Sequence, residues 1–322
     1  MVGDEMTRDA RVAFFTALID DAGLFPPASL PMEEAVTTHR QCRRGEHGWM
    51  LARFICPASR LPELERCFSD EESATPWRVS VILDGATGDR WLDGALADLI
   101  VARHFADSVG DRARVELLET PPPDQIDVPL LRKFVGTVES AGLSHPVTPF
   151  LEVPHAASPP ATLGILAELR EEWSDGSTCR PLGAKLRCGG ASEESFPTPA
   201  RVASFIHECH RLGVPFKATA GLHHPFRHVD PATGFVQHGF VNILGASVLA
   251  SAHELIAGVI EEIVSDHDPG SFSLTPERFS WRDYSATDSE ILAARQSLFT
   301  SYGSCSFSEP VEDLTALGVL PL

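Results

Sequence analysis

The chain has 322 residues, of which 43% are hydrophobic and 22% charged, a composition typical of a folded globular protein. The 45 acidic and 26 basic residues give a formal net charge of −19, which argues against nucleic acid or a membrane surface as a partner. The start of the sequence has no secretory signal pattern, and the seven cysteines show no C-x-x-C spacing. We therefore expect reduced thiols and a cytoplasmic protein.

Short apolar runs bounded by turn residues recur along the chain and predict β-strands. Six runs are clear, at residues 50–55, 78–83, 113–118, 148–153, 182–187 and 214–219. Their starts lie 28 to 35 residues apart, and segments with helical periodicity separate them. This spacing indicates βαβ units and therefore parallel strands.

Capping residues mark several of the intervening helices. Asp127 is placed to cap one helix, and Thr198 with Pro199 is placed to open another. The pattern Ser251-x-x-Glu254 predicts a capping box before a further apolar helix. A last long helix is expected from Ser289 to Phe299.

Strands and helices that alternate in this way predict either a closed (βα)8 TIM barrel or an open doubly wound sheet. No G-x-G-x-x-G turn follows an early strand, which favours the barrel. A barrel needs two more strands, for which residues 22–25 and 279–284 are the candidates. We expect one barrel domain over residues 1–322, with a histidine-rich insertion after the seventh strand.

Charged side chains alternate with the apolar ones along the predicted strands and should line the barrel interior. These residues are Arg53, Asp84, Glu116, Glu152, Lys185, Arg187 and Lys217. Most lie near the C-terminal ends of their strands, where barrel enzymes carry their chemistry. The alternative is a set of rim charges that are solvated or paired with one another.

The lysines are the sharpest signal, because the chain has only three: Lys133, Lys185 and Lys217. Lys133 is expected on a helix surface, whereas the other two occupy matching inward positions of neighbouring strands. Lysine, unlike arginine, can lose its proton and form a Schiff base. We expect repulsion between the two ammonium groups to lower the pKa of both amines. The alternative is that both groups simply bind an anion.

Residues 148–221 resemble the C-terminal half of deoxyribose-phosphate aldolase and related class I aldolases. The matching segments are TPFLEV, GAKLRCGG, TPARV and VPFKATAGL. The resemblance implies that Lys185 forms the Schiff base and that Lys217 keeps it unprotonated. It also implies that turns at Gly189, Gly190 and Gly221 offer backbone N–H groups to a phosphate or carboxylate. The acid/base residue of the family is not placed by the resemblance, and Asp84 or Glu116 is a candidate substitute.

Four histidines follow the predicted seventh strand: His223, His224, His228 and His238. They suit general acid/base catalysis, because the pKa of histidine lies near neutrality. Alternatively, His223, His228 and His238 could bind a divalent metal ion with a strand carboxylate. A third interpretation is that they are ordinary loop residues.

These observations are compatible with three functions. The first is a Schiff-base lyase or aldolase without a cofactor, acting on a small, anionic carbonyl substrate; a homo-oligomer is compatible with it. Its expected catalytic residues are Lys185, Lys217, Glu152, Asp84 and His223. Its expected substrate-binding residues are Arg187, Arg53, Glu116, Gly189, Gly190, Gly221 and His224. The second is a metal-dependent barrel hydrolase or isomerase that uses the loop from His223 to His238. The third is a non-catalytic binding protein that retains the barrel.

Overall fold

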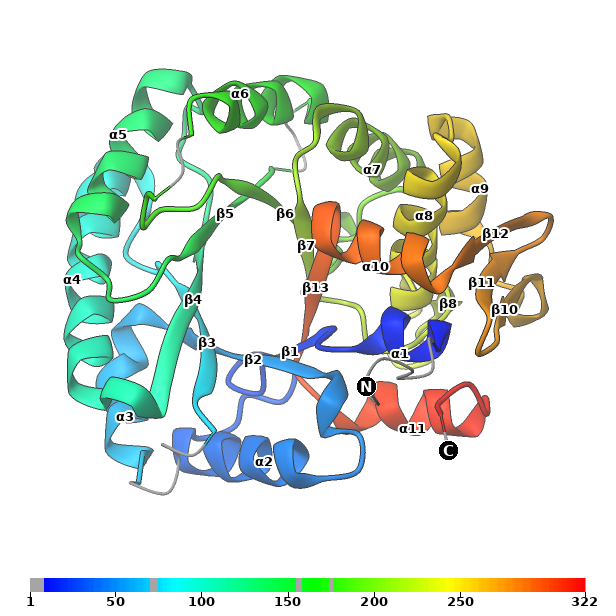
Figure 1. Cartoon of the computed structure of the whole chain (residues 1–322), viewed down its shortest axis with the longest axis horizontal. Helices are drawn as coiled ribbons and strands as arrows, with labels where there is room; N and C mark the ends of the chain where they lie inside the picture. The colour runs from blue at the N-terminus through cyan, green and yellow to red at the C-terminus, as the bar shows by residue number, and fades with distance from the viewer. Residues whose placement is uncertain (1–8, 70–74, 155–157, 174–175, 322) are drawn as a thin grey trace, which may run out of the picture.

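The computed structural model describes residues 9–69, 75–154, 158–173 and 176–321, so the first eight residues, part of the start examined for a secretory signal, lie outside it. Eight parallel strands form a closed barrel with helices around it (Figure 1). The predicted (βα)8 barrel is confirmed. In spatial order the strands are β1 (Ile19–Asp21), β13 (Phe299–Ser304), β7 (Phe216–Thr219), β6 (Gly183–Arg187), β5 (Thr148–Glu152), β4 (Ala113–Thr120), β3 (Trp77–Ile82) and β2 (Leu51–Pro57).

Helices cover the outside of the barrel and bury their apolar faces against the strands or, as α9 does, against neighbouring helices. The helices are α1 (Ala10–Phe15), α2 (Met32–Arg44), α3 (Leu61–Cys67), α4 (Trp91–Val109), α5 (Val128–Ser140), α6 (Pro159–Glu171), α7 (Pro199–Leu212), α8 (Phe240–His253), α9 (Ala257–Ser265), α10 (Asp288–Ser297) and α11 (Ser308–Ala316). The expected caps form on α5 and α7, where Asp127 accepts from the Leu130 amide and Thr198 accepts from the Arg201 amide.

The six clearly predicted strands are all present, but the two remaining candidates are wrong. The first barrel strand is Ile19–Asp21, and residues 22–25 follow it. The eighth is Phe299–Ser304, at and beyond the end of the helix predicted up to Phe299. Its sequence, FTSYGS, lacks an apolar run because its inward side faces polar groups rather than a hydrophobic core.

The segment 279–284 instead belongs to a three-stranded antiparallel sheet outside the barrel. This sheet contains β10 (Phe272–Leu274), β11 (Arg278–Trp281) and β12 (Tyr284–Thr287). Phe279 and Trp281 of β11 are buried because the sheet packs on the outer helices, including α1, α8 and α10. The apolar pattern at 279–284 therefore predicted a strand correctly, but the strand belongs to this outer sheet and not to the barrel.

The capping box predicted at Ser251 and Glu254 is also wrong. Both residues lie at the C-terminal end of α8, where Glu254 has a left-handed backbone with φ of 51°. Helix α8 is buried on all sides from Phe240 to Ala250, which explains its continuous apolar sequence. Within the described residues, no helix combines the length and apolar character needed to span a membrane.

The histidine-rich insertion lies after β7, as expected. It contains a two-stranded hairpin formed by β8 (His228–Val229) and β9 (Val236–Gln237). His238 follows the hairpin, is fully buried, and lies 2.6 Å from the carbonyl oxygen of Pro197 through its Nε2. This contact ties the insertion to the loop that precedes α7.

Close approach of two backbones at the start of α4 yields a stability prediction. A Cβ atom at Gly94 would lie 1.9 Å from the carbonyl oxygen of Gly85, whereas a Cβ at Gly136, inside α5, would meet nothing within 4 Å. We expect Gly94→Ala to lower the free energy of unfolding by about 2 kcal/mol or more. Gly136→Ala should raise it by roughly 0.5–1 kcal/mol, because alanine is the better helix former. Urea unfolding of both variants checks this, and equal stabilities would contradict the close approach of α4 to the loop that follows β3.

Candidate active site

The two inward lysines lie side by side inside the barrel. Lys185 and Lys217 are direct partners in the register between β6 and β7, and Glu152 is the partner of Lys185 across β5 and β6. Lys217 is fully buried and Lys185 is 5% exposed. The alternation of side chains along each strand, read from the sequence, therefore placed this pair correctly.

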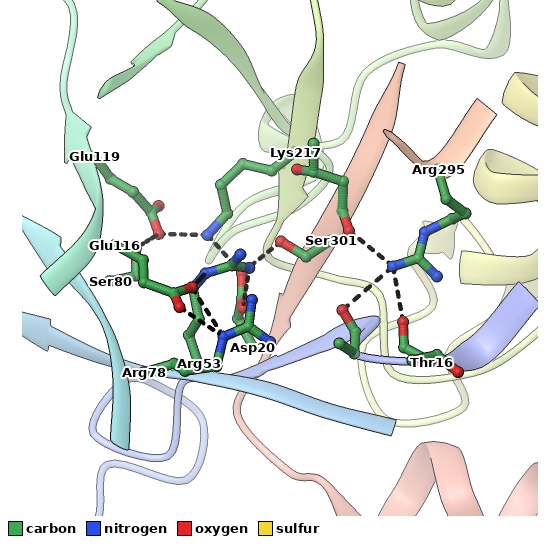
Figure 2. Close-up of polar contacts among 12 residues, drawn as sticks. Thr16, Asp20, Arg53, Arg78, Ser80, Glu116, Glu119, Lys217, Arg295 and Ser301 are labelled. Atoms are coloured by element: carbon green, nitrogen blue, oxygen red, sulfur yellow. Dashed lines mark hydrogen bonds and ion pairs between the residues drawn. The ribbon is translucent and has the colours of Figure 1, made fainter. Parts of the chain in front are cut away.

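Glu119, near the end of β4, joins the two amines. Its Oε1 lies 2.5 Å from Nζ of Lys217, and its Oε2 lies 3.3 Å from Nζ of Lys185 (Figure 2 shows the contact with Lys217). The hydroxyl of Ser80 donates a further hydrogen bond of 2.7 Å to Oε1. With only 1% of its surface exposed, Glu119 is a buried carboxylate held between two cations.

The pKa values of these groups correct one expectation. Burial alone would lower the pKa of Lys185, but the carboxylates of Glu119 and Glu152 outweigh burial and raise it above its ordinary value. Conversely, burial would raise the pKa of Glu119, but the two ammonium groups lower it to about 2. The expected lowering of the Lys185 pKa by its neighbouring lysine is therefore wrong, because a carboxylate lies between the two amines.

Asp20, on β1, completes the surroundings of Lys217. Its Oδ2 lies 2.8 Å from Nζ of Lys217 and accepts a 2.7 Å hydrogen bond from the hydroxyl of Ser301 on β13 (Figure 2). Asp20 is fully buried. Sequence reasoning missed it because the first strand was placed a few residues too late.

Glu119 was missed for a different reason, which is a β-bulge in β4. Val79 of β3 pairs with Val115, but the next residue, Ser80, pairs with Leu117, so Glu116 is an extra residue. The bulge reverses the alternation beyond it and turns Glu119 inward. A strict two-residue period places Glu119 on the outer face, and nothing in the sequence marked the bulge.

Two other predicted site residues, Arg53 and Glu116, contact each other, and Glu116 precedes Glu119 on β4. Nε of Arg53 lies 2.9 Å from Glu116, and its Nη1 lies 3.4 Å from Asp20. Arg78 also donates to Glu116 at 2.9 Å. The expectation that the inward charges gather at the C-terminal ends of the strands is therefore wrong for Arg53 and Glu116, which lie in the middle of β2 and β4 (Figure 2 shows their contact).

Asp84 does not join the lysines. It follows β3 and accepts hydrogen bonds from the amide and hydroxyl of Ser59, at 3.0 and 2.6 Å. The strand ends before Asp84, so the inward alternation does not extend to it. Glu152 is therefore the partly exposed carboxylate beside Lys185. It lies 3.1 Å from Nζ of Lys185, and its side chain is 19% exposed.

Arg187 and the glycine turns lie at the C-terminal mouth of the barrel. Nε of Arg187 donates to the carbonyl of Gly189 at 3.0 Å, and the described residues include no carboxylate partner for it. Gly189 and Gly221 pack backbone to backbone: a Cβ at Gly189 would lie 2.9 Å from Cα of Gly221. The amides of Gly189, Gly190 and Gly221 donate no hydrogen bond within the described part of the chain.

The histidines are dispersed over different partners. His223 lies 3.1 Å from Glu309 and His224 lies 2.7 Å from Asp313, two carboxylates on α11. His228 contacts the carbonyl of Phe226 at 3.0 Å. Burial lowers the pKa of His238 to about 4. The structure does not bring His223, His228 and His238 together, and the described residues contain no group of three side chains suited to a metal ion.

Comparison with known families found no matching family model, and comparison with curated proteins found no matching sequence.

The depressed pKa of Glu119 makes stability depend on pH. The carboxylate is ionised in the folded protein down to about pH 2, so its contribution is present above the ordinary glutamate pKa of 4.5 and is lost as the pH falls toward 2. We expect Glu119→Gln to lower the free energy of unfolding by about 3 kcal/mol at pH 7. The difference from wild type should shrink between pH 4.5 and 2, as measured by urea unfolding at several pH values.

The matched control is Glu172→Gln, which removes a carboxylate that pairs with Arg132 on the surface. Exposed ion pairs contribute little, so this variant should remain close to wild type at every pH. Equal losses in the two variants would show that burial between the lysines does not strengthen the Glu119 interactions.

Proposed function

We propose that the protein is a Schiff-base lyase or aldolase that acts on a small carbonyl substrate carrying an anionic group. The observation that carries the proposal is the pair of lysine amines, aligned across neighbouring strands and joined by one buried carboxylate. Burying several charges is costly unless they have partners, and a primary amine is the group that barrels use for imine chemistry. The resemblance of residues 148–221 to class I aldolases supports the same assignment.

Lys185 is the amine best placed to attack a carbonyl. It is the more exposed of the two, and it contacts Glu152 on its partly exposed side. Lys217 is fully buried and bound by both Asp20 and Glu119, so it serves as the fixed cation beside the reacting amine. Asp84 and His223 have other partners, which leaves Glu152 as the group that moves protons at Lys185.

The reaction begins when Lys185 transfers a proton to Glu152 and its neutral Nζ adds to the carbonyl carbon. Glu152 returns its proton to the hydroxyl of the resulting carbinolamine, which leaves as water, and a protonated imine remains. In the cleavage direction, a base takes the proton of the β-hydroxyl, the bond between the α and β carbons breaks, and its electron pair passes into the imine to form an enamine. An aldehyde leaves, and protonation of the enamine followed by hydrolysis regenerates the amine.

The anionic group of the substrate would bind at the mouth above the amines. Arg187 lies two residues after Lys185 on the same face of β6, and its guanidinium has no carboxylate partner among the described residues. The backbone N–H groups of Gly189, Gly190 and Gly221, which donate no hydrogen bond within the described residues, lie at the turns after β6 and β7. A guanidinium beside free backbone N–H groups suits a carboxylate or phosphate.

Borohydride trapping tests the proposal directly. Reduction in the presence of a panel of short aldehydes and 2-oxo acids should attach one substrate molecule covalently to Lys185. Mass mapping of peptides locates the adduct. Lys185→Met should abolish the adduct, while Lys133→Met, at an outer helix, should leave it unchanged. Absence of any adduct on Lys185 across the panel would overturn the proposal and favour a non-catalytic binding protein.

The raised pKa of Lys185 predicts how trapping depends on pH. Only the neutral amine adds to a carbonyl, so the trapping rate should rise with pH toward and beyond the ordinary lysine pKa of 10.5. Glu152→Gln removes one of the carboxylates that raise this pKa, so the rise should occur at a lower pH, by about one unit. A rate profile measured from pH 6 to 11 for both proteins checks the shift; an unmoved profile would show that Glu152 does not control the amine.

A further inference from the structure

An alternating row of charges runs through the barrel and ends at the proposed nucleophile, Lys185. It passes from Arg53 to Asp20, from Asp20 to Lys217, from Lys217 to Glu119, and from Glu119 to Lys185. Figure 2 shows this row from Arg53 to Glu119. The described side chains in it are at most 13% exposed, so solvent screens these charges only weakly.

The balance of charge within the row depends on Arg53. Asp20 and Glu119 are two fully enclosed carboxylates, each of which needs a cation. With Arg53 beside Asp20, Lys217 offsets more of the charge of Glu119, so Glu119 holds the ammonium form of Lys185 less strongly. Without Arg53, Lys217 has to serve both carboxylates, and Glu119 retains Lys185 as an ammonium.

We propose that Arg53 is a positioning residue that offsets the charge of Asp20 and thereby allows Lys185 to lose its proton. Arg53 acts through Asp20 and Lys217, and nothing in the geometry requires it to touch the substrate. The proposal rests on the proposed function for its purpose, but the charge coupling that it describes is a property of the folded protein alone.

Charged and polar groups face the row from several strands of the barrel. Lys185 faces Glu119, Glu152 and the neighbouring Lys217, and the hydroxyls of Ser80 and Ser301 donate to the two carboxylates. Arg53 also faces Glu116.

Two further arginines, Arg78 and Arg295, lie near Arg53, but neither makes an ion pair with Asp20. Arg78 contacts Glu116 and is 40% exposed at its side chain. Arg295 is close enough to repel Arg53 and to attract Asp20, but its guanidinium donates to backbone carbonyls, including those of Phe14 and Thr300, and makes no ion pair with a described carboxylate. Among the described arginines, only Arg53 makes an ion pair with Asp20.

The test measures the protonation of Lys185 without any substrate. The chain has only three lysines, so ¹³C-labelled lysine gives three Cε resonances, with Lys133 as an internal reference. We expect Arg53→Gln, which keeps hydrogen-bond donors but removes the charge, to raise the titration midpoint of Lys185 by about one pH unit. At a fixed pH below the midpoint, the neutral fraction of this amine should fall about tenfold. Arg53→Lys, which keeps the charge, should restore most of the wild-type value.

The matched control is Arg78→Gln, which loses a cation from the same Glu116 but not from Asp20, and should leave Lys185 unchanged. An unmoved midpoint in Arg53→Gln, or an equal shift in Arg78→Gln, would overturn the inference. If Arg53→Gln does not fold, the double variant with Asp20→Asn removes both charges and should titrate like wild type. A midpoint clearly below wild type in that variant would show that Arg53 does not offset Asp20.

The outcome is separable from the proposed function. Because the titration needs no carbonyl compound, a shift in Arg53→Gln together with a failure of borohydride trapping would reject the lyase and retain the charge coupling. Trapping on Lys185 with an unmoved titration would do the reverse.

Discussion

The interior of this barrel depends on one carboxylate, Glu119, lying between two lysine amines. Two ammonium groups on neighbouring strands repel each other strongly in a weakly polar interior, and neither can move away, because each is fixed by its strand. Glu119 makes the arrangement stable by contacting both amines at once. The same contact lowers its own pKa to about 2 and raises that of Lys185. The contact with Glu119 that stabilises the two buried amines therefore also favours the ammonium form of Lys185, which cannot attack a carbonyl.

This opposition explains why the polar network extends so far beyond the two lysines. Asp20, Arg53 and Glu116 continue the alternation of charge, and the hydroxyls of Ser80 and Ser301 donate to Glu119 and Asp20. Each added partner reduces the cost of burying the previous one. A reactive amine in such a site depends on the whole balance of charge around it, and not only on its nearest neighbour.

The barrel mouth and the barrel interior divide the tasks that the proposed chemistry requires. The interior fixes the amines and their charges, while the mouth contributes Arg187, the glycine turns and the partly exposed Glu152. The histidine-rich insertion stands apart from both, since His223 and His224 are engaged by α11 and His238 by the loop before α7. A dense run of histidines in the sequence thus corresponds to a set of separate structural contacts.

Sequence alone determined the architecture and the central pair of residues. The regular spacing of strands and helices is a local property, and a lysine at matching inward positions of two adjacent strands follows from strand alternation and from the scarcity of lysine in the chain. Only the tertiary structure decided what surrounds that pair. Glu119 faces inward because of a bulge, Asp20 because the barrel closes between β1 and β13, and Arg53 turns to Asp20 and Glu116 rather than to the mouth. These contacts join residues up to 281 positions apart in the chain, as in the hydrogen bond from Ser301 to Asp20, and are set by strand register and closure, which local patterns do not encode.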